Sequence, residues 1–194
     1  MTPGRLLLRS TVGGFFIGHG TQKLFGWFGG HGLDNTGQFF ENIGLRPGRR
    51  HALAAGAAEA GGGALIALGA ATPLAASVLI ATMLTAIKRV HLKNGPWSTN
   101  GGYEYNAVLI AAALALAETG PGSPSIDAAR GSEMKGPKWA LVALALGIAG
   151  AAGAHLAAGA APAPESTPAP EPADAAEPAP ADAASTQSEP TTAA

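Results

Sequence analysis

The sequence predicts an all-α integral membrane protein, with a four-helix transmembrane bundle, a C-terminal fifth transmembrane helix and a disordered tail. Three observations lead to this fold class. Five apolar segments each approach the roughly 20 residues that a helix needs to cross a bilayer. Only 13% of the 194 residues are charged, about half the share found in soluble domains. Residues 161–194 have a different composition, which is unsuited to a packed core.

The five apolar segments are separated by polar loops or by turn signals. A Thr-Pro dipeptide divides the second segment from the third, with Thr72 as the predicted N-cap and Pro73 at the helix start. These two segments should therefore form a tight helical hairpin. The fourth segment ends at the breaker cluster GPGSPS. The segments span residues 5–28, 52–71, 73–92, 103–119 and 139–160.

A soluble, alanine-rich helical bundle is the alternative fold. The second and fifth segments, however, have no polar stripe of the kind that a surface helix needs. Small residues also recur at the spacing that lets membrane helices approach closely. Examples are Gly56, Ala60 and Gly63 in the second segment and Gly147 and Ala151 in the fifth. Both features favour the membrane protein.

The tail and the charge balance set further limits. Residues 161–194 contain eight prolines and six acids, without Lys, Arg or aromatic residues, so we expect disorder. All 12 basic residues and 7 of the 13 acids precede the tail, which leaves the rest of the chain with a formal charge of +5. Basic loops account for that charge in a membrane protein, and no nucleic-acid partner is predicted. Because the chain has no cysteine, disulfides and thiolate metal sites are excluded.

Alternating helices place the loops on two sides, which we name side A and side B. Side A holds the N-terminus and the loop 120–138, and side B holds the loops 29–51 and 93–102. The basic residues of the two sides nearly tie in number, so the positive-inside rule does not set the orientation. Trp27 and Trp97 fall at the side B boundary, as an interfacial aromatic belt would.

Nine polar or ionisable residues fall in the side B half of the predicted bundle. Three of them share one face of the first segment, at positions i, i+3 and i+4. Glu59 lies eight residues into the second segment, about 12 Å deep at 1.5 Å per residue. Ionisable residues in spanning helices are costly and usually face the bundle interior. The nine residues are His19, Gln22, Lys23, Glu59, Thr85, Lys88, His91, Tyr103 and Glu104.

This polar cluster has two interpretations. Its acids and bases can pair into a network that fixes helix register. Alternatively, the cluster forms a pocket at membrane depth that binds a polar head group, such as a quinone ring or a lipid, or relays protons through His and Glu. Histidine and acid spacings typical of metal sites are missing, and nothing matches haem, flavin or iron–sulfur ligation. We therefore predict no metal site and no intrinsic cofactor, and we assign no catalytic residue.

The first side B loop predicts a short amphipathic helix. Asn35 or Thr36 is its candidate N-cap, and Gln38 follows at the spacing of a capping box. Such a helix would lie at the membrane interface over the side B mouth, either as a lid or as an ordinary connector. Its apolar face holds Phe39, Phe40 and Ile43.

Five motifs occur in order along residues 5–128. They are HGTQKLFGWFGGHGL at 19–33, Glu59 with the GGG that follows, KNG at 93–95, GGYEY at 101–105 and GPGSPSID at 120–127. Together they resemble the DoxX family of small bacterial and archaeal membrane proteins. The resemblance implies a four-helix membrane bundle over residues 1–128. Residues 129–160, a linker and the fifth helix, and the tail at 161–194 are additions to that bundle.

The resemblance also implies a quinone-linked function. The family is named for a subunit associated with quinone-linked oxidation in archaeal respiratory chemistry. Some of its members are linked to membrane oxidoreductase assemblies and oxidative-stress defence. We therefore expect a multi-pass protein of the bacterial inner membrane, its N-terminus cytoplasmic and its tail external. It would be an accessory subunit with oxidoreductase or respiratory-chain partners, not an independent enzyme. The alternatives are a small carrier for a metabolite or protons and a membrane scaffold for partner proteins.

Overall fold

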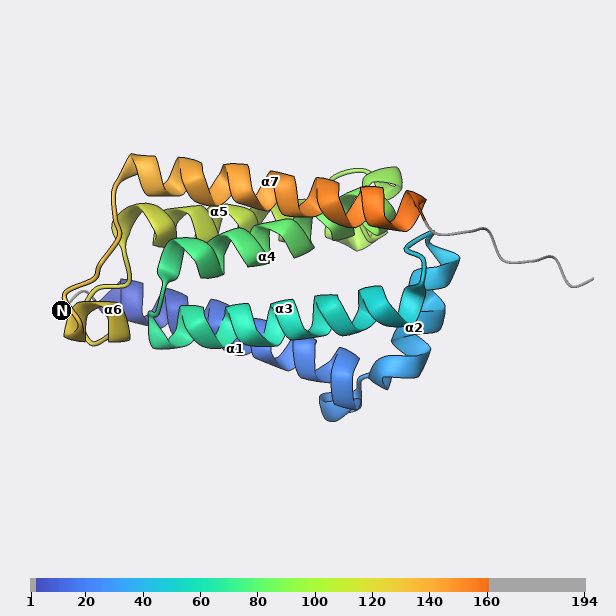
Figure 1. Cartoon of the computed structure of the whole chain (residues 1–194), viewed down its shortest axis with the longest axis horizontal. Helices are drawn as coiled ribbons and strands as arrows, with labels where there is room; N and C mark the ends of the chain where they lie inside the picture. The colour runs from blue at the N-terminus through green and yellow to red at the C-terminus, as the bar shows by residue number, and fades with distance from the viewer. Residues whose placement is uncertain (1–2, 161–194) are drawn as a thin grey trace, which may run out of the picture. The chain divides into compact units, whose positions relative to one another are not determined.

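The computed structural model describes residues 3–160, which form helices and connecting loops with no β-strand among them (Figure 1). The predicted tail lies outside the described residues. The all-α fold class is confirmed for the described part of the chain. The longer helices are α1 (Pro3–Phe25), α2 (Gly32–Asn42), α3 (Gly48–Leu68), α4 (Thr72–Ala86), α5 (Glu104–Thr119) and α7 (Pro137–Gly159). The shorter elements are α6 (Ile126–Ala129), the π-helical turn η2 (Ile87–His91) and the 3-10 turns η1 (Trp27–Gly29), η3 (Leu92–Asn94) and η4 (Ser98–Asn100).

Three helices of the described part are long and apolar enough to cross a membrane. They are α3, α4 with its continuation to Asn94, and α7. Helix α1 has 23 residues, but glycines and polar residues interrupt its apolar stretch. Helix α5 has 16 residues, which at 1.5 Å each give about 24 Å, less than the roughly 30 Å hydrocarbon core.

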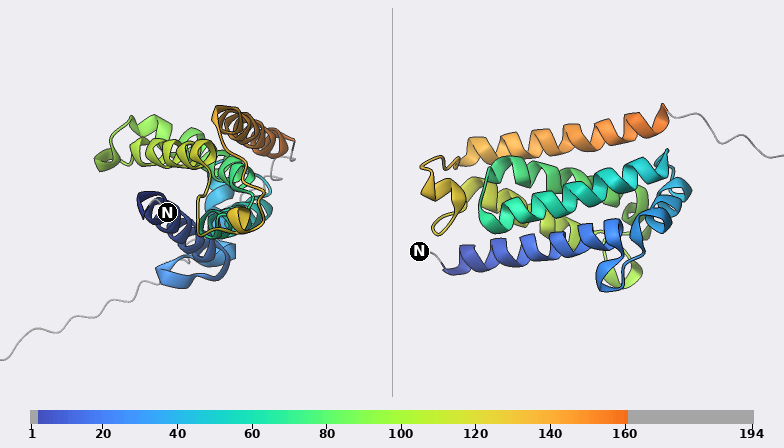
Figure 2. Two further views of the ribbon diagram at one scale, coloured as in Figure 1. Left: turned by 90° about the vertical axis from the view of Figure 1, so that its left-hand side faces the viewer. Right: turned by 60° about the horizontal axis from the view of Figure 1, so that its bottom comes forward.

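Helix α4 is the centre of the bundle. It packs against α3, α5 and α7, whereas α1 packs mainly against α3 (Figure 2). The side chains at these contacts form one apolar core, and the largest of them are almost completely buried. These fully buried side chains include Phe16 from α1, Ile66 from α3, Leu79 and Ile80 from α4, and Leu116 from α5.

Glycines set the closest helix contacts, as the small-residue spacing predicted. A Cβ atom at Gly13 would lie 2.5 Å from the backbone oxygen of Gly63, and one at Gly63 would lie 2.7 Å from the oxygen of Gly13. The same holds for α7, where a Cβ at Gly147 would lie 2.5 Å from Ile80 Cγ2. Close approach of α1 to α3 and of α7 to α4 is therefore confirmed.

The start of α4 is held by a residue distant in sequence, and the predicted Thr72 N-cap is wrong. The N-cap is Ala71, whose φ is 46° and whose side chain cannot accept a hydrogen bond. The backbone N–H groups of Ala71 and Thr72 donate instead to the carboxylate of Asp127, at 2.9 and 3.2 Å. The Thr72 hydroxyl donates to the same carboxylate at 3.2 Å. Asp127, at the start of α6, therefore caps α4.

Arg9 of α1 is the second buried ionisable residue on side A, with 5% of its surface exposed. Its guanidinium donates to the backbone oxygens of Pro121 at 3.2 Å and Gly122 at 3.4 Å, and also to that of Pro124. The segment GPGSPSID thus wraps around Arg9 and supplies Asp127. This segment closes side A, where α6 lies beside the start of α1 (Figure 1).

On side B, α1 ends at Phe25, three residues before the predicted boundary, because Gly26 turns the chain with a φ of 73°. The short helix predicted in the following loop is confirmed as α2, but its predicted start is wrong. Its N-cap is His31, and the Asn35 side chain donates back to the His31 oxygen at 3.1 Å. Helix α2 lies against the start of α3, where Gly37 closely approaches Arg49.

Candidate functional site

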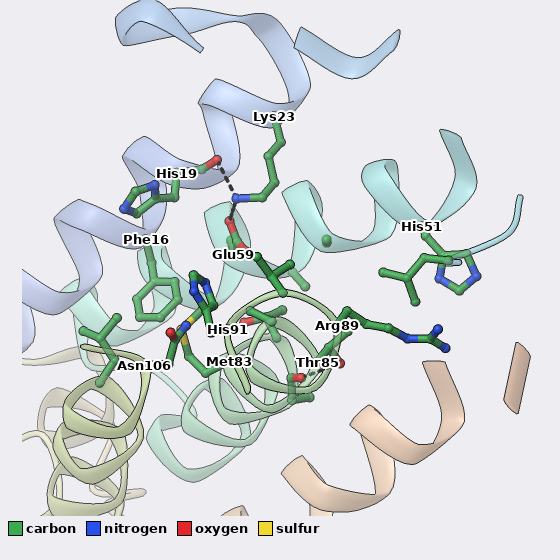
Figure 3. Close-up of a pocket in the computed structure, with 18 of the residues that line it drawn as sticks. Phe16, His19, Lys23, His51, Glu59, Met83, Thr85, Arg89, His91 and Asn106 are labelled. Atoms are coloured by element: carbon green, nitrogen blue, oxygen red, sulfur yellow. Dashed lines mark hydrogen bonds and ion pairs between the residues drawn. The ribbon is translucent and has the colours of Figure 1, made fainter. Parts of the chain in front are cut away.

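A cavity of about 830 Å³ lies in the side B half of the described bundle. Helices α1, α3, α4, α5 and α7 all contribute to its wall, and α2 covers part of it with Phe39, Phe40 and Ile43. Most lining side chains are apolar, which suits an apolar or amphiphilic ligand. The polar exceptions include two groups (Figure 3), besides Ser77, Thr82, Ser98 and Tyr105. The His19 group contains His19, Lys23, Glu59, His91 and Asn106, and the Arg89 group contains His51, Thr85 and Arg89.

A buried ion pair joins α1 to α3 in the His19 group. Lys23 Nζ lies 2.6 Å from Glu59 Oε2, and their side chains are 24% and 6% exposed. Lys23 also donates to the backbone oxygen of His19 at 3.4 Å. The pair can form because Gly20 and Gly56 let the two helices approach closely here. Removing one partner of such a pair leaves the other as a costly uncompensated buried charge.

His91 and Asn106 complete the His19 group from the other helices. His91 closes the π-helical turn η2, and its Nδ1 lies 2.7 Å from the backbone oxygen of Gly101. Asn106 of α5 is 7% exposed and donates to the sulfur of Met83 at 3.3 Å. In Figure 3 these residues lie near His19 at one end of the cavity, with the Lys23–Glu59 pair next to them. π-Helical turns inside helices are frequent at functional sites.

Four of the nine residues singled out in the sequence do not line the cavity: Gln22, Lys88, Tyr103 and Glu104. The Gln22 amide oxygen accepts a hydrogen bond from His19 Nδ1 at 3.1 Å and its amide nitrogen donates to the backbone oxygen of Phe28 at 3.2 Å, so Gln22 fixes the exit of α1. Lys88 is exposed. Tyr103 is the N-cap of α5, and its backbone N–H donates to the oxygen of Gly95 at 3.2 Å.

Glu104 closes the second side B loop, outside the apolar part of α5 at residues 107–117. Its carboxylate oxygen Oε1 accepts two hydrogen bonds, one from the backbone N–H of Ser98 at 2.7 Å and one from the Ser98 hydroxyl. Both hydrogen bonds stabilise the charged form and so lower the pKa of Glu104 below its ordinary value. The bond from the Ser98 side chain has the larger effect, and the bond from the Ser98 backbone has the smaller one. Glu104 therefore acts on the loop conformation.

Sequence reasoning missed the Arg89 group except for Thr85. Arg89 of η2 donates through Nε to His155 Nδ1 of α7 at 3.0 Å, and through Nη1 to the Ile43 oxygen at 3.4 Å. Thr85 bonds its own helix, at the Ala81 oxygen. The spacing of Thr85 and Arg89, four residues apart on one face, was the available signal. The His155 contact depends on how α7 docks, which no local pattern shows.

The chemistry that the lining offers is hydrogen bonding, charge and proton exchange. No group of three or more potential metal-ligating side chains is found among residues 3–160. The His19 group provides an ammonium donor, a carboxylate acceptor and two imidazoles beside an apolar volume. Such an arrangement can hold a polar ring at its edge and can move protons to or from it.

These features define a class: an all-helical membrane protein with an apolar cavity that contains two polar groups. The family model of DoxX matches residues 4–92. A protein of Bacillus subtilis (strain 168) with the name "Putative oxidoreductase CatD" is 35% identical over 113 residues, 58% of this chain and 78% of that protein. The chain belongs to the DoxX family, and the resemblance seen in its motifs is confirmed. No solved structure matches it.

Proposed function

We propose that this protein is an accessory subunit of a quinone-linked membrane redox or oxidative-stress system, and that its His19 group binds the quinone head group. The observation that carries the proposal is the buried Lys23–Glu59 pair at the edge of an apolar cavity. Membership of the DoxX family and the oxidoreductase name of the Bacillus subtilis relative support it.

The residues of the His19 group match what a quinone needs. The Lys23 ammonium can donate a hydrogen bond to a quinone oxygen, and Glu59 can accept one from a quinol hydroxyl. Reduction of a quinone takes two electrons and two protons, one proton for each ring oxygen. His19 and His91 line the same cavity, and an imidazole can both accept and donate a proton. The electrons come from a partner oxidoreductase or respiratory-chain protein, which carries the redox cofactor.

The proposal includes a placement in the membrane. Helices α1, α3, α4 and α5 form a four-helix transmembrane bundle, and α7 is a fifth transmembrane helix. Side A faces the cytoplasm with the N-terminus, so the side B mouth of the cavity and the tail face outward. In α1, His19 and Lys23 line the cavity and Lys23 pairs with Glu59 of α3, as expected for ionisable residues of a spanning helix.

The test is a binding titration with a fully substituted benzoquinone on purified full-length protein in detergent micelles. The double variant Lys23→Met/Glu59→Gln removes the pair without leaving one buried charge alone. We expect its dissociation constant to rise about tenfold or more, because a hydrogen bond to a charged group is lost. The control is Asp34→Asn/Arg49→Gln, which removes an ion pair whose side chains are 86% and 68% exposed. Equal quinone affinity in the double variant and the wild type would refute the proposal.

A further inference from the structure

The Arg89 group has a charge that the described chain does not neutralise. The two hydrogen-bond partners of the guanidinium, His155 Nδ1 and the Ile43 oxygen, are both neutral acceptors. No carboxylate of residues 3–160 lies within ion-pair distance of Arg89. In the His19 group, by contrast, Lys23 has Glu59. A partly buried guanidinium is costly unless acceptors or an anion satisfy its donors, and Arg89 has two acceptors where Arg9 has three.

The cavity that Arg89 lines also has an apolar lining from α3, α4 and α7, which suits an alkyl chain. Helix α7 packs mainly against α4 and α5, and residues of both α3 and α7 line the cavity. Many of the lining residues from these three helices are small or aliphatic. They include Ala54 and Ala58 of α3, Val78 and Ala81 of α4, and Leu146 and Gly150 of α7.

The depth of Arg89 identifies the source of the anion. Arg89 lies near the side B end of the apolar helix Thr72–Asn94, about 8 Å from Asn94 at 1.5 Å per residue. That depth corresponds to the boundary between lipid head groups and acyl chains, not to the bilayer centre. His51 of α3 also lines the cavity, and Figure 3 shows it on the same side of the view as Arg89.

We propose that the Arg89 group is a binding site for an anionic phospholipid. The lipid phosphate accepts charge-assisted hydrogen bonds from Arg89, and one acyl chain lies against the apolar lining from α3, α4 and α7. His155 and the Ile43 oxygen orient the guanidinium for this contact. His155 lies on α7, which is outside the residues that the family model matches. The Arg89 group and the His19 group line the same cavity through different side chains, and this proposal does not depend on quinone binding.

The test is native mass spectrometry of the full-length protein titrated with phosphatidylglycerol or with phosphatidylcholine of the same acyl chains. We expect the wild type to bind phosphatidylglycerol about tenfold more tightly, and Arg89→Gln to lose that preference. Lys88→Gln is the matched control, because it removes the same charge from the neighbouring, exposed position. Arg89→Lys should retain part of the preference, since it keeps a cation. Equal losses in Arg89→Gln and Lys88→Gln would overturn the proposal.

A second pair of variants tests the apolar lining. Ala54→Phe fills part of the space for the acyl chain, whereas Ala57→Phe adds the same ring on the same helix at an exposed position outside the cavity lining. We expect only Ala54→Phe to weaken phosphatidylglycerol binding, with the helical circular dichroism and the elution volume of both variants unchanged. Equal effects would overturn the proposal. The proposal would also be overturned if the protein bound palmitate through Arg89 but did not bind phosphatidylglycerol. The site would then be one for a fatty-acid carboxylate.

Discussion

Side A and side B of this bundle bury the same kinds of side chain and use them differently. On side A, Arg9 and Asp127 are satisfied mainly by backbone groups: carbonyl oxygens accept from the guanidinium, and N–H groups donate to the carboxylate. On side B, Lys23 and Glu59 are satisfied by each other. Only the side B pair lines the cavity.

Under the proposed function, this difference separates buried charges that hold the fold from buried charges that bind a ligand. Backbone partners cannot leave without unfolding the segment that carries them, so Arg9 and Asp127 hold the fold. Side-chain partners at a cavity edge can rotate and share their hydrogen bonds with a ligand. Loss of a side A charge should therefore mainly reduce stability, and loss of the side B pair should mainly reduce binding.

The largest effect on stability should come from Arg9→Met. The substitution leaves the buried carbonyl oxygens of Pro121 and Gly122 without their donor. We expect the free energy of unfolding to fall by about 3 kcal/mol, from hydrogen bonds to a charged group. The measurement is unfolding of purified protein in mixed micelles, followed by circular dichroism. Arg130→Met, at an exposed side A position, is the control and should change little. A similar loss in both variants would contradict the structural role of Arg9.

The next effect concerns the close approach of α1 to α3 on side B. Gly20→Ala would place a methyl group against the backbone of Gly56 and Ala60, and we expect a loss of about 2 kcal/mol from this overpacking. Gly18→Ala, two residues away on α1, would meet no atom within 4 Å. It should be neutral or stabilise the helix by up to about 1 kcal/mol. Thermal unfolding of the two variants compares them directly, and equal midpoints would show that α1 does not pack on α3 through this face.

The smallest effect concerns the Glu104 loop. Because the pKa of Glu104 is lower in the folded protein than in the unfolded chain, its charged form favours folding. That stability is present above the unfolded pKa, near 4.3, and is lost as the pH falls through the lower folded pKa. Glu104→Gln should therefore lower the unfolding midpoint slightly at pH 7, and this difference should shrink as the pH falls below the unfolded pKa. Glu118→Gln, exposed at the other end of α5, is the control. A difference between wild type and Glu104→Gln that does not shrink as the pH falls would contradict this role.

The parts of the fold that the sequence predicts are those set by local pattern. Apolar length predicts the long helices, and the spacing of Gly56, Ala60 and Gly63 predicts the contact of α3 with a neighbour. The N-cap of α4 was misassigned because the group that binds its N–H groups, Asp127, comes from a distant segment. The end of α1, just before Gly26, also differs from its predicted end at residue 28. A glycine permits a turn, but its presence in the sequence does not determine that the chain turns there.

Part of the candidate site could likewise be predicted from the sequence, and part of it could not. Alternating helix direction places His19, Lys23, Glu59 and His91 in one half of the bundle, and all four line the cavity. Sequence depth does not say which way a side chain turns, however. Glu104 turns back to its own loop, and its charge is satisfied there by Ser98. The contact between Arg89 and His155 could not be predicted from the sequence, because it depends on how α7 packs against α4.

The central claim is that the side B half contains a ligand cavity while the side A charges serve the fold, and thiol labelling tests it most directly. The chain has no cysteine, so each introduced thiol is the only one. Thr85→Cys places a thiol in the cavity lining, and Ala117→Cys places one at a fully buried core position of α5 outside it. We predict that a small maleimide labels Thr85→Cys much faster, and that a fully substituted benzoquinone slows this labelling. Equal labelling of the two thiols, or no protection by the quinone, would contradict the account.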